Sequence, residues 1–169
     1  PVPAAVEVLE GCSPGEIPAR VFDSENPILL KGLVAGWPAV AACSQSLAGA
    51  ARYLSGFWIE QPVTVYVGDA GIESRFFYNE DFTGFNFRSG TARLGQVLQK
   101  LAEQEQTGEE STIYVGSTPV DRWLPGFRAQ NDVSLPVSGA LASFWLGSRT
   151  RISAHFDFPD NLVCVVAGR

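Results

Sequence analysis

Short runs of apolar residues with the character of β-strands recur along the chain. The clearest is residues 62–68, Pro-Val-Thr-Val-Tyr-Val-Gly, in which β-branched residues alternate with others as they do in a strand that buries one face. A shorter run at residues 27–32 ends at Gly32. The same character marks residues 75–78, 111–116, 140–147 and 162–166. We therefore expect a chain built largely from short strands.

Two segments have helical periodicity instead. Residues 91–106 place apolar side chains three and four positions apart, which predicts a helix with one apolar stripe: Leu94, Val97, Leu98 and Leu101. Gly108 is suited to end that helix. Residues 46–54 favour a shorter helix with Ser46 as its N-cap. Residues 1–26, rich in Pro, Gly and acidic residues, predict mostly irregular structure.

The order of these elements indicates the fold class. Strands dominate, and the two helices do not alternate regularly with them, so the pattern favours a mainly β fold with antiparallel strands and helical decoration over a βαβ array. The 169 residues contain no repeat and no linker. We therefore expect residues 1–169 to form a single domain.

Composition narrows the classes of function. Acidic residues outnumber basic ones by 18 to 12, and no cluster of Lys and Arg interrupts that balance, so we expect no nucleic-acid partner. No apolar run approaches the length of about 18 residues that spans a bilayer, so we expect no membrane association. The three cysteines are an odd number, far apart and without metal-ligand spacing. They favour a reducing, cytoplasmic location.

The strongest chemical signal is the tripeptide His155-Phe156-Asp157, which contains the only histidine of the chain. In an extended strand, residues i and i+2 point to the same face, so the imidazole and the carboxylate would be directed at one point. They are two of the donors in the triad of two histidines and one carboxylate that binds non-haem Fe(II). A solvated turn, or a core histidine bonded to a nearby carboxylate, would have the same sequence. The apolar runs on both sides favour a metal, because an ionisable pair on such strands needs a partner.

Residues 150–169, which carry this tripeptide, resemble the cupin-like JmjC family of Fe(II)- and 2-oxoglutarate-dependent oxygenases. The resemblance is closest to the branch that includes the asparaginyl hydroxylase of hypoxia signalling. Three other stretches resemble the same family in the same order: residues 27–38, which end in Gly-Trp-Pro, residues 75–87 and residues 112–116. Together they cover most of residues 20–169, although only the His-x-Asp stretch is strongly specific.

The resemblance implies a double-stranded β-helix, the jelly-roll fold of cupins, and an enzyme that hydroxylates a side chain of a protein or peptide substrate. It implies Fe(II) and 2-oxoglutarate as cofactors, with His155 and Asp157 as the first two iron ligands. Tyr114 matches a tyrosine that contacts 2-oxoglutarate, and Asn161 matches a polar position near the metal and cosubstrate. Relatives often carry a threonine hydroxyl where this chain has Ile152, and Ser153 would be its substitute.

Two observations predict an incomplete fold. The distal histidine has no counterpart, since there is no second histidine. The apolar run at 162–166 would leave an unpaired strand edge. We therefore expect an incomplete jelly roll in a chain truncated on its C-terminal side, or else an edge covered by a second subunit of a homodimer.

Two other classes of protein compete with the oxygenase. One is a non-catalytic jelly-roll binding module that keeps a vestigial metal pair. The other is a metal cupin that needs no cosubstrate, but such proteins usually carry His-x-His, and the carboxylate of Asp157 argues against this class.

Overall fold

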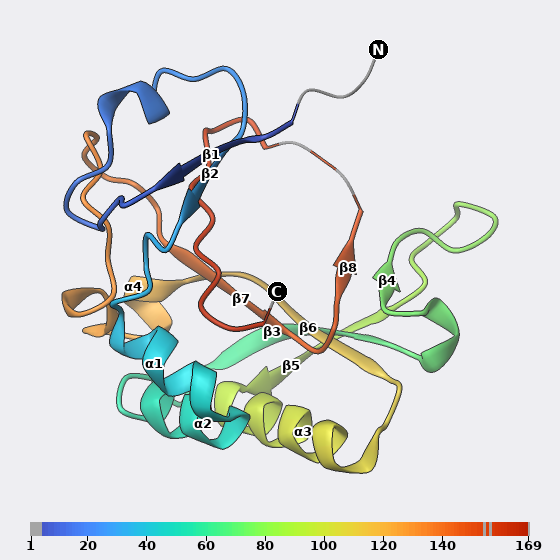
Figure 1. The fold of residues 1–169 in the computed structure, drawn as a ribbon. Helices are drawn as coiled ribbons and strands as arrows, with labels where there is room; N and C mark the ends of the chain where they lie inside the picture. Colours follow the sequence, from blue (N-terminus) through green and yellow to red (C-terminus); the bar gives the residue numbers. More distant parts are fainter. Residues whose placement is uncertain (1–4, 154, 156, 169) are drawn as a thin grey trace.

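The computed structural model describes residues 5–153, 155 and 157–168. Figure 1 shows the arrangement of its elements. The strands are β1 (Glu7–Glu10), β2 (Ile28–Lys31), β3 (Pro62–Gly68), β4 (Arg75–Phe76), β5 (Arg88–Arg93), β6 (Thr112–Pro119), β7 (Ser143–Gly147) and β8 (Arg151–Ile152). The α-helices are α1 (Pro38–Gln45), α2 (Leu47–Ser55), α3 (Leu94–Thr107) and α4 (Val120–Trp123). Three 3-10 turns accompany them: η1 (Ala19–Val21), η2 (Ala70–Ile72) and η3 (Phe127–Ala129).

A four-stranded sheet forms the centre of the fold. Its strand order is β5-β3-β6-β7, and every neighbouring pair is antiparallel, as the sequence predicts. Tyr66 of β3 lies opposite Tyr114 of β6 in this register. Two smaller parallel pairs, β1 with β2 and β4 with β8, lie outside the central sheet.

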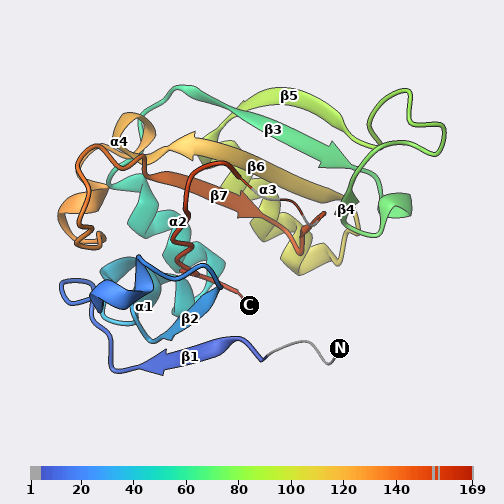
Figure 2. The ribbon, with the colours of Figure 1, turned by 90° about the horizontal axis from the view of Figure 1, so that it is seen from above.

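One face of the central sheet carries the apolar core. Ile113 and Val115 of β6 pack with Val97 and Leu101 of α3, and Val115 has no exposed surface. Burial of these side chains against the helix is the main force that holds the two layers together. In Figure 1, α2 and α3 lie on this side of the sheet, and the chain after β7 runs on the other side. Figure 2 shows β1 and β2 set apart from the central sheet.

Both predicted helices are present with shifted limits. Ser46 caps α2 as predicted, because its hydroxyl accepts a hydrogen bond of 3.0 Å from the Gly49 amide. Helix α3 begins three residues later than predicted, at Leu94, because residues 91–93 pair with β3 as the end of β5. Gly108 ends α3 with a φ of 70°, a left-handed conformation that glycine adopts without strain.

Four of these strands and α-helices were not predicted from the sequence, and two predicted strands were overstated. Strands β1 and β5 and helices α1 and α4 were not predicted, although Pro38 at the first position of α1 is a recognised helix-start signal. The strand expected around the tripeptide is reduced to β8, which pairs with β4 and ends at Ile152. The apolar run at 162–166 pairs with no strand among the described residues.

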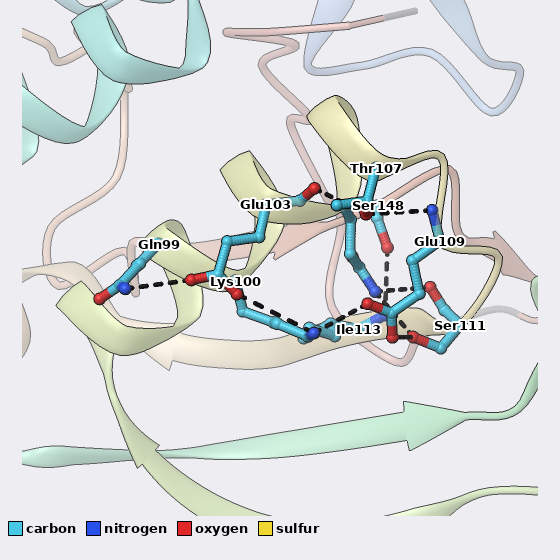
Figure 3. Close-up of polar contacts among 9 residues, drawn as sticks. Gln99, Lys100, Glu103, Thr107, Glu109, Ser111, Ile113 and Ser148 are labelled. Carbon is cyan, nitrogen blue, oxygen red and sulfur yellow. Dashed lines mark hydrogen bonds and ion pairs between the residues drawn. The ribbon is translucent and has the colours of Figure 1, made fainter.

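A polar network fixes the short connection from α3 to β6 (Figure 3). The Lys100 ammonium donates to Glu109 at 2.8 Å, and this contact raises the pKa of Lys100 and lowers that of Glu109. Gln104, which is buried, donates to the carbonyl of Ser111 at 2.7 Å. These contacts hold the start of β6, and therefore Tyr114, at a set position relative to α3.

The turn after β7 is equally constrained. Ser148 and Ile113 exchange two hydrogen bonds of 3.1 Å, one from the Ser148 amide and one to its hydroxyl. Arg149 adopts a left-handed φ of 48°, which is uncommon for a residue with a side chain. At Gly147 a Cβ atom would lie 2.9 Å from the carbonyl oxygen of Ile113. Only glycine therefore allows this close approach of the turn to β6.

None of the described helices has the length and apolar composition of a membrane span.

We expect Gly147→Ala to destabilise the fold by about 1–3 kcal/mol, because its methyl group would be forced against the backbone of β6. The measurement is the free energy of unfolding from denaturant titration. The matched control is Gly90→Ala in β5, where a Cβ atom meets nothing within 4 Å and the change should stay within about 0.5 kcal/mol. Equal stability of the two variants would show that the turn is not constrained in this way.

Candidate functional site

The face of the sheet opposite α3 carries an aromatic cluster and a cavity. Tyr114 stacks on Tyr66 with ring centroids 6.0 Å apart and contacts the Phe76 ring at 5.6 Å. Tyr114 also lines a cavity of about 500 Å³ between β6, β7 and the turn that follows. The remaining lining residues are Trp145, Leu146, Gly147, Arg149, Thr150, Ala167 and Gly168.

Tyr114 is set up to donate a hydrogen bond. Burial, and then the neighbouring Tyr66, raise the pKa of its phenol, so the hydroxyl keeps its proton at neutral pH. Gly116 makes room for the two rings, because a Cβ atom there would lie 3.3 Å from Tyr66 and 3.5 Å from Tyr114. A protonated phenol beside a cavity is suited to bind a carboxylate.

Arg149 adds a permanent positive charge to the same cavity. The sequence interpretation did not select this residue. The sequence signal that could have found it is the pair Arg149-Thr150, a basic residue and a threonine shortly before the His-x-Asp stretch. Together, Tyr114, Arg149 and Thr150 give the cavity a phenol, a guanidinium and a hydroxyl, a set that matches a small organic acid.

His155 lies just beyond β8 and is exposed. Its Nδ1 atom is 2.8 Å from the carbonyl oxygen of Ser153. A carbonyl oxygen can only accept, so Nδ1 carries the hydrogen in this contact and the lone pair of the neutral ring lies on Nε2. Metal-binding histidines commonly donate their second nitrogen to a carbonyl in this way.

The side chain of Asn161, one of the predicted polar residues, contacts Asp157. The amide of Asn161 donates to Oδ2 of Asp157 at 3.0 Å and makes a longer contact of 3.3 Å with the carbonyl of Pro159. This contact orients the carboxylate and leaves Oδ1 for another ligand. The Ser153 hydroxyl is buried and has no hydrogen-bond partner in the part of the chain that the structure describes.

The structure joins the predicted residues in two pairs and does not assemble them into one site. Ser153 contacts His155, and Asn161 contacts Asp157, whereas Tyr114 lines the cavity without any of these four. The chain itself limits the separation: Thr150 of the cavity is five residues before His155, so their Cα atoms lie within about 17 Å. Within the described ranges, no three His, Cys, Asp or Glu side chains form a metal-binding group.

The strand geometry expected for the tripeptide is not observed. His155 and Asp157 lie outside any strand, and Phe156, expected on the opposite face, falls outside the described residues. Among the described residues of this segment, Arg151 and Ile152 are those that pair with a strand, and the strand is β4. The pair is therefore positioned by local hydrogen bonds and not by a sheet.

The comparisons with known proteins agree with the sequence resemblance at the level of the family. A family model described as a cupin-like domain matches residues 14–169, nearly the whole chain. No curated protein matches the chain significantly. With a mainly antiparallel sheet, accompanying helices and a family match of this extent, the chain belongs to the cupin-like domain family of the JmjC type.

Proposed function

We propose that this protein is an Fe(II)- and 2-oxoglutarate-dependent oxygenase that hydroxylates a side chain of a protein or peptide. The observation that carries the proposal is a pair of supporting hydrogen bonds: His155 Nδ1 donates to the Ser153 carbonyl, and the Asn161 side-chain amide donates to Asp157. Each bond restrains one donor and leaves its metal-binding atom available. Membership of the cupin-like family, which includes oxygenases of this type, is consistent with it.

The donor set fits Fe(II). His155 would supply a neutral imidazole nitrogen and Asp157 a carboxylate oxygen, two of the three protein donors of the facial triad. The exposure of both residues suits a site that must keep coordination positions open for small molecules. The family fold proposed here, a double-stranded β-helix, would include the central sheet as one of its walls.

The cavity residues fit 2-oxoglutarate. Arg149 would pair with a carboxylate of the cosubstrate, and the protonated phenol of Tyr114 would donate to the same group. The unpartnered Ser153 hydroxyl, placed next to His155, would bond the end of the cosubstrate nearest the metal. The Tyr66 ring stacks on Tyr114 and the Phe76 ring contacts it, so the two rings cover part of the phenol.

Bound Fe(II), with 2-oxoglutarate and dioxygen, supplies the oxidation of a substrate C–H bond to an alcohol, with release of succinate and carbon dioxide. The contribution of the protein is to hold these groups in a fixed geometry beside the substrate. By resemblance to the asparaginyl hydroxylase branch, an amide or other polar side chain of a peptide is the proposed target.

We expect the protein to form succinate when Fe(II), 2-oxoglutarate and a peptide library are present. In His155→Ala and in Asp157→Ala the rate of succinate formation should fall to background, because each change removes a proposed metal ligand. The measurement is succinate formation followed by mass spectrometry. The matched control is Asp160→Asn, which alters a neighbouring exposed carboxylate and should retain the parent rate.

Two outcomes would contradict the oxygenase. One is the absence of succinate with every peptide, and the other is an equal rate in His155→Ala. If metal binding persists without turnover, the protein is instead a binding module with a vestigial metal pair.

Asn161→Ala should weaken the binding of Mn(II), used as a stable substitute for Fe(II), by about 10- to 100-fold, because the Asp157 carboxylate loses the contact that orients it. Isothermal titration calorimetry measures this change directly. Asp160→Asn again serves as the control and should bind as the parent does. Unchanged Mn(II) affinity in Asn161→Ala would show that the Asn161 contact does not support a metal site.

A further inference from the structure

The segment between β4 and β5 exposes aromatic rings to solvent. Here it is called the aromatic hairpin and comprises residues 77–87. Tyr78, Phe82 and Phe85 are 48%, 69% and 60% exposed. In Figures 1 and 2 the hairpin projects from the end of the central sheet, away from the helices. Large apolar side chains gathered in this way on a projecting segment usually mark an interaction site.

Hydrogen bonds between its two arms stabilise the hairpin. Tyr78 and Phe85 form an antiparallel bridge, and the amide of Asn79 donates to the carbonyl of Gly84 at 3.0 Å. At its base, the side chain of Asn86 accepts from the Phe77 amide and donates to the Arg75 carbonyl. The exposed rings are therefore presented on a formed scaffold, which lowers the entropy lost on binding.

The rings form a connected series of contacts from the hairpin to the candidate site. The Tyr78 and Phe85 rings stack at 5.3 Å, and Phe85 stacks on Phe87 at 4.9 Å. Phe87 contacts Phe76 at 5.2 Å, and Phe76 contacts Tyr114 of the cavity at 5.6 Å.

The base of the hairpin is also joined to the segment that carries the metal pair. Phe76 pairs with Ile152, three residues before His155. A chain lying along the hairpin would thus reach the candidate site.

Charge determines which chain the hairpin would accept. The tip carries Glu80 and Asp81, and no basic residue occurs between residues 77 and 87. Asp81 stays ionised because hydrogen bonds from Thr83 lower its pKa. The two flanking cations are already engaged: Arg75 lies 4.9 Å from the Phe77 ring centroid, and Arg88 pairs with Asp69 at 2.9 Å. The Arg75 contact also shows that a ring of this hairpin accepts a guanidinium on its face.

We infer that the aromatic hairpin is the docking surface for the polypeptide substrate, and that it selects a segment carrying arginine or lysine. Exposed ring faces would take the cationic groups, and Glu80 and Asp81 would provide the complementary charge. This inference rests on the proposed function for the identity of the bound segment as a substrate. It adds to that function the class of sequence that the substrate contains.

The test measures peptide binding by fluorescence anisotropy without Fe(II) or 2-oxoglutarate, so that it does not depend on catalysis. Three labelled peptides of equal length and equal apolar content carry Arg, Gln or Glu at the same positions. We expect the Arg peptide to bind about tenfold more tightly than the Gln peptide. The affinity should fall with added salt, and the Glu peptide should bind most weakly.

Variants locate the surface. The double change Phe82→Ser with Phe85→Ser should weaken binding of the Arg peptide about tenfold. The double change Glu80→Gln with Asp81→Asn should remove most of the preference for the Arg peptide over the Gln peptide. Asn at position 81 keeps an oxygen that can accept from Thr83. The matched control is Phe22→Ser, an exposed phenyl ring after η1, which should leave binding unchanged. Thermal unfolding of each variant verifies the fold.

Three results would overturn the inference. The first is equal binding of the Arg and Gln peptides, and the second is parent-like binding in the Phe82/Phe85 variant. The third is a change of molecular mass in that variant with no change in peptide affinity, which would assign the hairpin to self-association. If the hairpin variants form succinate at the parent rate, the docking surface is refuted and the proposed oxygenase is not. If the protein binds the Arg peptide selectively but forms no succinate, the proposed oxygenase is refuted and the docking surface is not.

Discussion

The alternation of side chains along β6 is the constraint on which the other features depend. Ile113 and Val115 face α3 and are buried, whereas Tyr114 faces the opposite side and lines the cavity. A shift of the strand by one residue would exchange the two faces, exposing the core and burying the phenol against the helix. The hydrophobic core and the candidate cosubstrate site are therefore set by one register. The polar network between α3 and the start of β6 holds that register at one end.

Aromatic contacts extend this constraint to parts of the chain that make few other connections. Within the part of the chain that the structure describes, strands β4 and β8 pair with each other and with no other strand, yet Phe76 of β4 packs on Tyr114 and Phe87. Because β8 ends three residues before His155, the same contacts limit how far the candidate metal pair lies from the sheet. Aromatic pairs of this kind contribute about 0.5–1.5 kcal/mol each beyond their buried area. The hairpin, the cavity and the His-x-Asp segment thus share one group of rings.

The elements of the fold that were predicted from the sequence are those with strong local patterns. Strand β3 was predicted from its alternation, helix α3 from its apolar stripe, and the start of α2 from the cap at Ser46. Each of these patterns reflects a buried face or a specific hydrogen bond. Strand β5 was missed because it is an edge strand of mostly exposed residues and lacks the alternation that burial produces. Residues 162–166 show the opposite case. Val163 and Val165 are exposed and their neighbours are half-buried, so the alternation is present although no described strand pairs with this run.

The candidate site was predicted to a smaller extent than the fold. The residue types of the His-x-Asp stretch led to the prediction of a metal site, but the hydrogen bonds that orient the two side chains depend on the local path of the backbone. Arg149 was missed because its place in the cavity follows from a left-handed turn that no single residue type signals. The link between the hairpin and Tyr114 required the tertiary structure, since Phe76 and Phe87 beside the hairpin contact or approach Tyr114 of β6 and Tyr66 of β3 across separate parts of the sequence.

The central claim is that His155 and Asp157 bind one ion beside the cavity that contains Tyr114. Paramagnetic broadening of amide signals by Mn(II), measured in the isotopically labelled protein, tests it most directly. The account predicts broadening that is strongest at His155, Asp157 and Asn161, extends to Thr150 and Tyr114, and disappears in His155→Ala. Broadening centred on other acidic residues such as Glu103 and Glu109, or confined to residues 155–161 without any effect at Tyr114, would contradict it.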